Sequence, residues 1–298
     1  MRTEQEMYDL IIRIANADER IRAVYMNGSR TNTNIIKDKY QVYDIVFVVT
    51  ETGSFLTDKN WISKFGEIAI VQEPEWNDIQ TGLYSGQHDS SRHYAWLMLF
   101  KDGNRIDLGI EIKEEAEKNF VDDKLTVLLL DKDGFLPKIP SPTDEDYHVK
   151  KPKNDEYTAI CNDFWWSLNN VAKGIARDEL PYAMEMYNLI VRTLMNKMVD
   201  WYIGVKTDFS VSTGKMGKFY KKYLPPELYD LYAKTYSDSD YNNMWTAVFT
   251  ACEMFRITAL EVGYHFDFIY NEHWDKSITD YLYKVRKSWN CFVGRFLN

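Results

Sequence analysis

The sequence predicts an α+β fold, with a mixed sheet and helices in the first half and an all-helical bundle in the second. Runs rich in β-branched residues and polar–apolar alternation occur before residue 134, whereas apolar residues at helical spacing dominate after residue 155. Between them, four of the eight prolines fall among charged residues, which is typical of an extended linker. We therefore expect domains at 1–134 and 156–298, joined by a Pro-rich linker at 135–155.

The first predicted element is an amphipathic helix. Thr3 followed three residues later by Glu6 makes a capping box, in which two backbone N–H groups are satisfied reciprocally. An apolar stripe on one helical face follows, and the helix is expected to end near Asp18. The stripe consists of Met7, Leu10, Ile11 and Ile14.

Short β-rich runs then predict a sheet. Strands are expected at 21–26, 42–50 and 126–130, with a short edge strand at 68–71. Together with the hairpin described next, they would make a sheet of roughly five strands, which is near the usual size.

A hairpin is predicted in the middle of this half. Residues 95–100 and 105–112 flank Asp102-Gly103, a dipeptide that favours a tight turn. The second arm alternates cleanly, so its polar residues should share one face of the sheet. These polar-face residues are Arg105, Asp107, Gly109 and Glu111.

The second half is expected to form helices throughout. A long helix is predicted at 156–177, and Pro181 suits the first turn of the next. Pro225-Pro226 opens another, and further helices are predicted at 242–262 and 276–293.

Composition excludes several classes of function. The net charge of −9 argues against sequence-independent binding of nucleic acid, which needs a basic face, and favours a cationic ligand. No apolar run approaches the length of a membrane span, and the N-terminus carries no apolar signal region. The three cysteines lack metal-type spacing, which is typical of reduced thiols. We expect a cytoplasmic protein that is a monomer or a weak homodimer, without a membrane or nucleic-acid partner.

The residues best suited to chemistry are a Gly-Ser turn and two acids. Gly28 and Ser29 leave one predicted strand, and such a turn can direct N–H groups and a hydroxyl at phosphate oxygens. Asp44 lies within the next apolar strand, where an acid is costly unless it is paired or bound to metal. Asp107 on a neighbouring strand offers a second carboxylate for Mg²⁺. Val42 stands two residues before Asp44, on the same face, where a further acid would complete the ligand set.

The chain resembles the streptomycin-modifying aminoglycoside 6-adenylyltransferases, members of the polymerase-β-like nucleotidyltransferase superfamily. The resemblance covers nearly the whole chain and rests on motifs in the family's order. These motifs are Gly28-Ser29-Arg30-Thr31-Asn32, Tyr43-Asp44-Ile45-Val46, the stretch from Phe100 to Leu108, Leu129 to Asp133, Cys161 to Trp165, Val171 to Gly174, Asn188 to Arg192 and Gly214-Lys215.

This resemblance implies a polymerase-β-like nucleotidyltransferase domain followed by a helical substrate-binding domain. It implies transfer of AMP from ATP, with Mg²⁺, to a hydroxyl of the streptidine ring of streptomycin, a cationic aminoglycoside. Gly28, Ser29 and Arg30 would bind the nucleotide phosphates, and Asp44 and Asp107 would hold the metal at the reacting centre. The family's first strand acid is absent, because Val42 occupies its position.

The helical domain is expected to supply a base and cations. Glu185 stands where the family tends to carry an acid, so it could accept the hydroxyl's proton or pair with guanidinium groups of the drug. Lys173 and Lys215 are candidates to neutralise the triphosphate. A solvated surface position is the alternative for each of the three.

Two other functions remain open from the sequence. Val42 favours a homologue that binds nucleotide or drug but has weakened turnover, because one metal ligand is missing. The stretch from Gln72 to Arg92 departs most from the family, which allows adenylyl transfer to a different acceptor. The five histidines share no metal-ligand spacing and are not expected to take part.

Overall fold

The computed structural model describes residues 1–82 and 88–296, with side chains up to residue 289. The chain divides into two compact units, Met1–Asp146 and Tyr147–Asn298. The division falls inside the segment for which the prolines predict a linker. Each unit is described by itself below.

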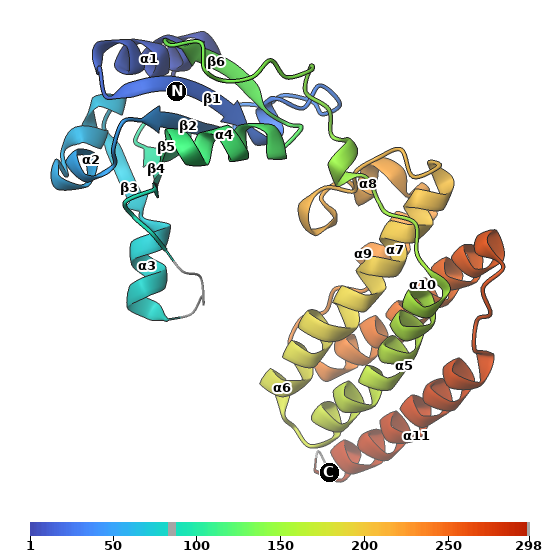
Figure 1. Cartoon of the computed structure of the whole chain (residues 1–298). Coiled ribbons are helices and arrows are strands. Elements are labelled where there is room, and N and C mark those ends of the chain that lie inside the picture. The colour runs from blue at the N-terminus through green and yellow to red at the C-terminus, as the bar shows by residue number, and fades with distance from the viewer. Residues whose placement is uncertain (83–87, 297–298) are drawn as a thin grey trace. The chain divides into compact units, whose positions relative to one another are not determined.

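The first unit contains a mixed sheet (Figure 1). Its described part has six strands, rather than roughly five, in the order β3-β4-β5-β2-β1-β6. The central pair, β2 and β5, is parallel, and every other neighbouring pair is antiparallel. The strands are β1 (Ile21–Asn27), β2 (Tyr43–Val49), β3 (Ile68–Gln72), β4 (His93–Phe100), β5 (Arg105–Ile112) and β6 (Val127–Asp131).

Helices cover the two faces of this sheet differently. One face packs against α1 (Glu4–Ala17) and α2 (Gly53–Thr57), whereas α4 (Lys113–Asp122) packs against the other, as Figure 1 shows. A short helix, α3 (Pro74–Thr81), connects β3 to the region before β4. The apolar cluster on the α1 side of the sheet contains many more residues than the cluster on the α4 side. Polar side chains therefore occupy more of the α4 side.

The helix start at Thr3 and the hairpin between β4 and β5 were both predicted correctly from short sequence patterns. Thr3 and Glu6 form the reciprocal capping box at the start of α1, and Asp18 ends the helix. The hairpin between β4 and β5 is confirmed, with Gly103 at φ +87°, a conformation that glycine adopts without a steric penalty. The alternation in β5 therefore sets its polar residues on the α4 side.

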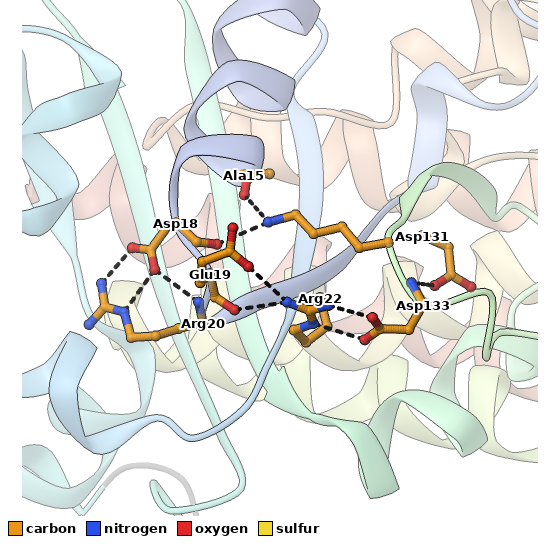
Figure 2. Close-up of polar contacts among 8 residues, drawn as sticks. Ala15, Asp18, Glu19, Arg20, Arg22, Asp131 and Asp133 are labelled. Atoms are coloured by element: carbon orange, nitrogen blue, oxygen red, sulfur yellow. Dashed lines mark hydrogen bonds and ion pairs between the residues drawn. The ribbon is translucent and has the colours of Figure 1, made fainter.

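A charged cluster ties the end of α1 to the edge of the sheet (Figure 2). Arg20 Nε donates to Asp18 Oδ1 at 2.9 Å, and Arg22 Nε donates to Asp133 Oδ2 at 2.8 Å. Lys132 Nζ donates to the carbonyl oxygens of Ala15 at 2.8 Å and Asp18 at 3.1 Å, and a cation there interacts favourably with the helix C-terminus. Each of these basic side chains thus has a carboxylate or a carbonyl beside it.

Residues 135–144 belong to the first unit and pack against the rest of it, although their proline content is typical of an extended linker. Leu136 is buried in the apolar cluster beneath α4, and Ile139 packs against the same cluster. Asp144 is buried and accepts hydrogen bonds from Asn32 Nδ2 at 3.1 Å and Asn34 Nδ2 at 2.8 Å. This contact holds the loop that follows the Gly-Ser turn.

The second unit is helical in its described part, as predicted. Large aromatic side chains fill its core, including Trp165, Trp201 and Trp245, and Phe164 stacks on Phe255 with ring centroids 3.8 Å apart. No described helix in either unit is long and apolar enough to cross a lipid bilayer. The helices are α5 (Asn154–Ala176), α6 (Leu180–Glu185), α7 (Arg192–Lys206), α8 (Tyr220–Tyr223), α9 (Pro226–Ala233), α10 (Tyr241–Phe266) and α11 (Glu272–Phe296), with a π-helical segment, Met186–Val191, between α6 and α7.

Candidate active site

Two carboxylates lie side by side on the α4 face of the sheet. The parallel register of β2 and β5 sets Asp44 directly opposite Asp107. Neighbouring strands are about 4.8 Å apart, so two side chains at paired positions on one face are close enough to share a ligand. The long crossover between β2 and β5 brings together acids that are 63 positions apart in the sequence.

Asp44 has an environment that disfavours its own charge. No hydrogen bond or ion pair reaches its carboxylate from the described part of the chain. Burial and the nearby negative charge of Asp107 raise the pKa of Asp44 to about 6. A cation at this position would relieve both effects, which is the behaviour expected of a metal ligand.

Asp107, in contrast, is already paired. Arg105, two residues earlier on β5, donates from Nε to Asp107 Oδ1 and from Nη2 to Oδ2, each at 2.7 Å. The pair is partly exposed, so solvent screens it and it is weaker than a buried pair. Arg105 therefore pairs with Asp107, whereas its charge offsets only part of the effect of burial on Asp44.

The Gly-Ser turn lies against Asp44. Gly28 follows β1 and has φ +77°, and a Cβ atom placed on it would lie only 2.5 Å from Asp44 Oδ2. Any other residue at position 28 would displace that carboxylate. Ser29 lies in the single 3₁₀ turn Gly28–Arg30, and no hydrogen bond in the described residues involves its hydroxyl, which leaves that group available to a ligand.

Arg30 is placed differently from the expected phosphate ligand. Its side chain is buried, with the guanidinium carbon 3.7 Å from the centroid of the Tyr43 ring. Nη2 donates to Gln41 O at 2.9 Å and Nη1 to Glu4 Oε1 at 3.2 Å. Arg30 thus anchors the turn and the start of β2 to α1. Its buried Nε has no hydrogen-bond partner among the described residues, and its charge lowers the pKa of nearby Asp44. A role for Arg30 in binding phosphate stays a prediction.

The donor set fits a divalent cation held by few protein ligands. Among the described residues, no group of three or more His, Cys, Asp or Glu side chains could together hold a metal ion. Val42 lies just before β2 and contributes no oxygen. Two aspartates nevertheless suit Mg²⁺, which prefers oxygen ligands and usually completes its shell with water and substrate phosphates.

The residues predicted in the second unit do not form one cluster. Lys173 lies on α5, beside Gly174, whose close approach to Ala183 packs α5 against α6. Glu185 ends α6, and Lys215 lies in a turn before α8; all three side chains are exposed. Figure 1 shows α6 and α8 at opposite ends of this unit. A role for these residues in catalysis stays a prediction.

Sequence reasoning missed a histidine–carboxylate pair on the same sheet face as Asp107. His93 begins β4, and its Nδ1 lies 3.0 Å from Oε1 of Glu75 on α3. Neither residue belongs to a recognisable motif, and 18 positions separate them, so they meet only because α3 packs against β4. Glu75 falls in the divergent stretch 72–92, of which residues 83–87 lie outside the described part, and His93 directly follows that stretch.

Comparison with known proteins identifies the family of the chain. A family model described as streptomycin adenylyltransferase matches residues 1–285. An aminoglycoside 6-adenylyltransferase from Campylobacter jejuni is 39% identical over 97% of this chain and 98% of its own length, and one from Bacillus subtilis is 38% identical over 94% and 97%. The crystal structure of an aminoglycoside 6-adenyltransferase from Bacillus subtilis aligns over 96% of this chain and 99% of its own, at 32% identity and a TM-score of 0.46. The chain belongs to the streptomycin adenylyltransferase family.

Proposed function

We propose that this protein transfers AMP from ATP to a hydroxyl group of an aminoglycoside, with streptomycin as the expected substrate. The observation that carries the proposal is the pairing of Asp44 with Asp107 beside the Gly28 turn, within a chain of this family. Relatives at 38–39% identity are named for the same transfer to aminoglycosides. The net charge of −9 suits a polycationic substrate.

Asp44 and Asp107 are proposed to hold Mg²⁺ at the reacting centre. When bound there, the ion would neutralise charge on the phosphate oxygens and on the departing pyrophosphate. Ser29 would donate its hydroxyl to a phosphate oxygen, and Gly28 would leave the space that the Asp44 carboxylate needs. Arg30 would fix the turn and keeps its predicted part as a cation for the nucleotide phosphates. The predicted roles in the second unit are kept as part of this proposal. Lys173 and Lys215 would neutralise phosphate charge. Glu185 would pair with the drug's guanidinium groups or act as the base.

The direct test is incubation of the protein with ATP, MgCl₂ and streptomycin, with pyrophosphate release and the mass of the drug as readouts. We expect stoichiometric pyrophosphate and a drug that carries one AMP. EDTA should abolish both. A panel of other aminoglycosides tests the acceptor, and NMR of the product identifies the modified hydroxyl. Absence of pyrophosphate release with every aminoglycoside would rule out the proposed activity.

A homologue that binds its ligands but turns over weakly is the second candidate, and Val42 favours it. The expected carboxylate is missing, and the described residues offer no third acid to replace it. In this case wild-type protein would bind ATP or streptomycin in calorimetry with little pyrophosphate release.

The variant Val42→Asp separates the two candidates. If two aspartates suffice, the added acid should tighten Mg²⁺ by about tenfold, because it adds one carboxylate, and should change kcat by less than threefold. Activity is measured against MgCl₂ concentration, with Tyr40→Asp, at an exposed position in the loop before β2, as the control for added charge. A rise in kcat of a hundredfold or more would instead favour the weakened homologue.

A further inference from the structure

The histidine–carboxylate pair at the start of β4 has the geometry of an oriented base. Glu75 is buried, and its Oε1 accepts from His93 Nδ1 at 3.0 Å while its Oε2 accepts from the Ala95 backbone N–H at 3.2 Å. With both oxygens engaged, the carboxylate is fixed and in turn fixes the imidazole. An imidazole that donates from Nδ1 presents Nε2 as its acceptor when it is neutral.

The free nitrogen of this imidazole lies over the same sheet face as the two aspartates. His93 is paired with Glu111 across β4 and β5, and the next residue on that face of β5 is Gly109. A Cβ atom placed on Gly109 would lie 3.5 Å from His93 Nε2, so the ring extends along the face toward Asp107. Residues two apart on a strand are about 7 Å apart, so a hydroxyl group placed between Nε2 and Asp107 would be within reach of both.

The charges around His93 favour proton uptake at Nε2. The hydrogen bond to Glu75 outweighs burial and raises the pKa of His93, with smaller contributions from Glu111 and Glu115. Burial alone would raise the pKa of Glu75, but hydrogen bonds from His93 and from backbone amides lower it, so Glu75 remains an anion near neutral pH. No hydrogen bond in the described residues reaches Nε2.

The other acids near His93 are already occupied. Glu111 is buried and accepts hydrogen bonds from the Tyr25 hydroxyl and from Asn119 Nδ2, the latter at 2.7 Å. Glu115 on α4 is held by Arg92, whose Nε donates to it at 2.8 Å. His93 is therefore the better placed of these groups to exchange a proton with a ligand on this face.

We infer that His93, oriented by Glu75, accepts the proton of the hydroxyl that attacks ATP. This inference rests on the proposed function and names the base for it within the first unit. The hydroxyl proton passes to Nε2 as the oxygen bonds to the α-phosphorus, and the bond from that phosphorus to the β-phosphate oxygen breaks to release pyrophosphate. Glu75 acts as a positioning residue, because it touches the imidazole and not the substrate.

The test compares His93→Asn with wild type and with Glu75→Gln. Asparagine can still donate to Glu75 but lacks Nε2, so kcat should fall about a hundredfold while KM for ATP stays within twofold. Since the base must be neutral, wild-type kcat should rise with pH through a limb centred above 6.5, the usual pKa of histidine. His93→Asn should lose that limb, and Glu75→Gln should move it to lower pH.

A second histidine–carboxylate pair provides the matched control. His88 Nε2 lies 3.2 Å from Oδ2 of Asp78, which is on α3 like Glu75, and His88→Asn should leave kcat and the pH limb unchanged. The inference is overturned if kcat of His93→Asn stays within threefold of wild type, or if this variant keeps the rise of kcat with pH. It is also overturned if wild-type kcat falls as pH rises, which would indicate an imidazolium bound to phosphate. An inactive wild type overturns the proposed function as well. An active wild type with an active His93→Asn variant overturns the inference alone.

Discussion

Asp18 and Asp44 are the same residue type in the same unit, and their surroundings are opposite. Asp18, in the cluster of Figure 2, accepts from Arg20 and from Trp61 Nε1, and these hydrogen bonds lower its pKa to about 2. Asp44 has no hydrogen-bonding partner among the described residues, and its pKa is raised to about 6. The first arrangement stabilises the fold. The second is costly to the folded protein, and the proposed role of Asp44 as a metal ligand would account for it.

The largest expected effect comes from removing the uncompensated acid. Asp44→Asn should lower kcat by about a thousandfold, because the proposed metal loses one of its two protein ligands. The variant should also be more stable. Since the pKa of Asp44 is raised in the folded state, its charge destabilises the fold as pH rises through about 6, and the amide should raise the free energy of unfolding at pH 7 by about 2 kcal/mol.

Urea unfolding at pH 5 and pH 8 measures the stability effect, and pyrophosphate release measures the activity. The gain in stability should be smaller at pH 5, where wild-type Asp44 is largely protonated. An Asp44→Asn variant that is both less stable and fully active would refute this assignment of the acid.

The next largest effect is expected at the turn beside Asp44. Gly28→Ala adds a Cβ 2.5 Å from Asp44 Oδ2 and forces alanine to φ +77°, so kcat should fall by tenfold to about a hundredfold. Gly134→Ala is the matched control, because Gly134 also has positive φ, +65°, but a Cβ there meets nothing within 4 Å.

Both glycine variants carry the backbone penalty of about 1 kcal/mol, which thermal unfolding should show for each. Only Gly28→Ala should lose activity. Equal kcat for the two variants would mean that the close approach of Gly28 to the carboxylate has no part in the reaction.

The smallest effect on activity is expected at the paired acid. Asp18→Asn should lower the free energy of unfolding at pH 7 by about 2 kcal/mol, because the folded state loses a charge-assisted pair with Arg20. A lowered pKa means that this contribution is present above the ordinary value of 3.8 and is lost as pH falls toward 2. At 25 °C and saturating substrates kcat should stay within twofold of wild type.

Stability would thus change in opposite directions at the two aspartates, and activity would fall only at Asp44. Wild type and Asp18→Asn should converge in stability as pH falls to 2 and below, which acid titration followed by circular dichroism can measure. A loss of kcat in a fully folded Asp18→Asn protein would contradict the structural role of the cluster in Figure 2.

Local signals account for what could be predicted of the fold. The capping box at Thr3, the turn at Asp102-Gly103 and the alternation along β5 each depend on residues within a few positions of one another. The candidate site was predictable only in part. Asp44 and Asp107 were recognisable from their strands and from the family resemblance, whereas the inward placement of Arg30 depends on Glu4, Gln41 and Tyr43, which no local pattern links to it.

The sequence by itself determined the fold class, the family and the order of elements, and it singled out Asp44 and Asp107 as candidate site residues. Periodicity, turn residues and motifs depend on residues that are close together in the sequence, so they can be recognised without the structure. Only the tertiary structure decided which of these groups meet. The parallel register of β2 and β5 sets Asp44 opposite Asp107, and the packing of α3 brings buried Glu75 to His93. Such contacts arise from strand pairing and burial between distant segments, and so does the difference between the paired Asp18 and the uncompensated Asp44.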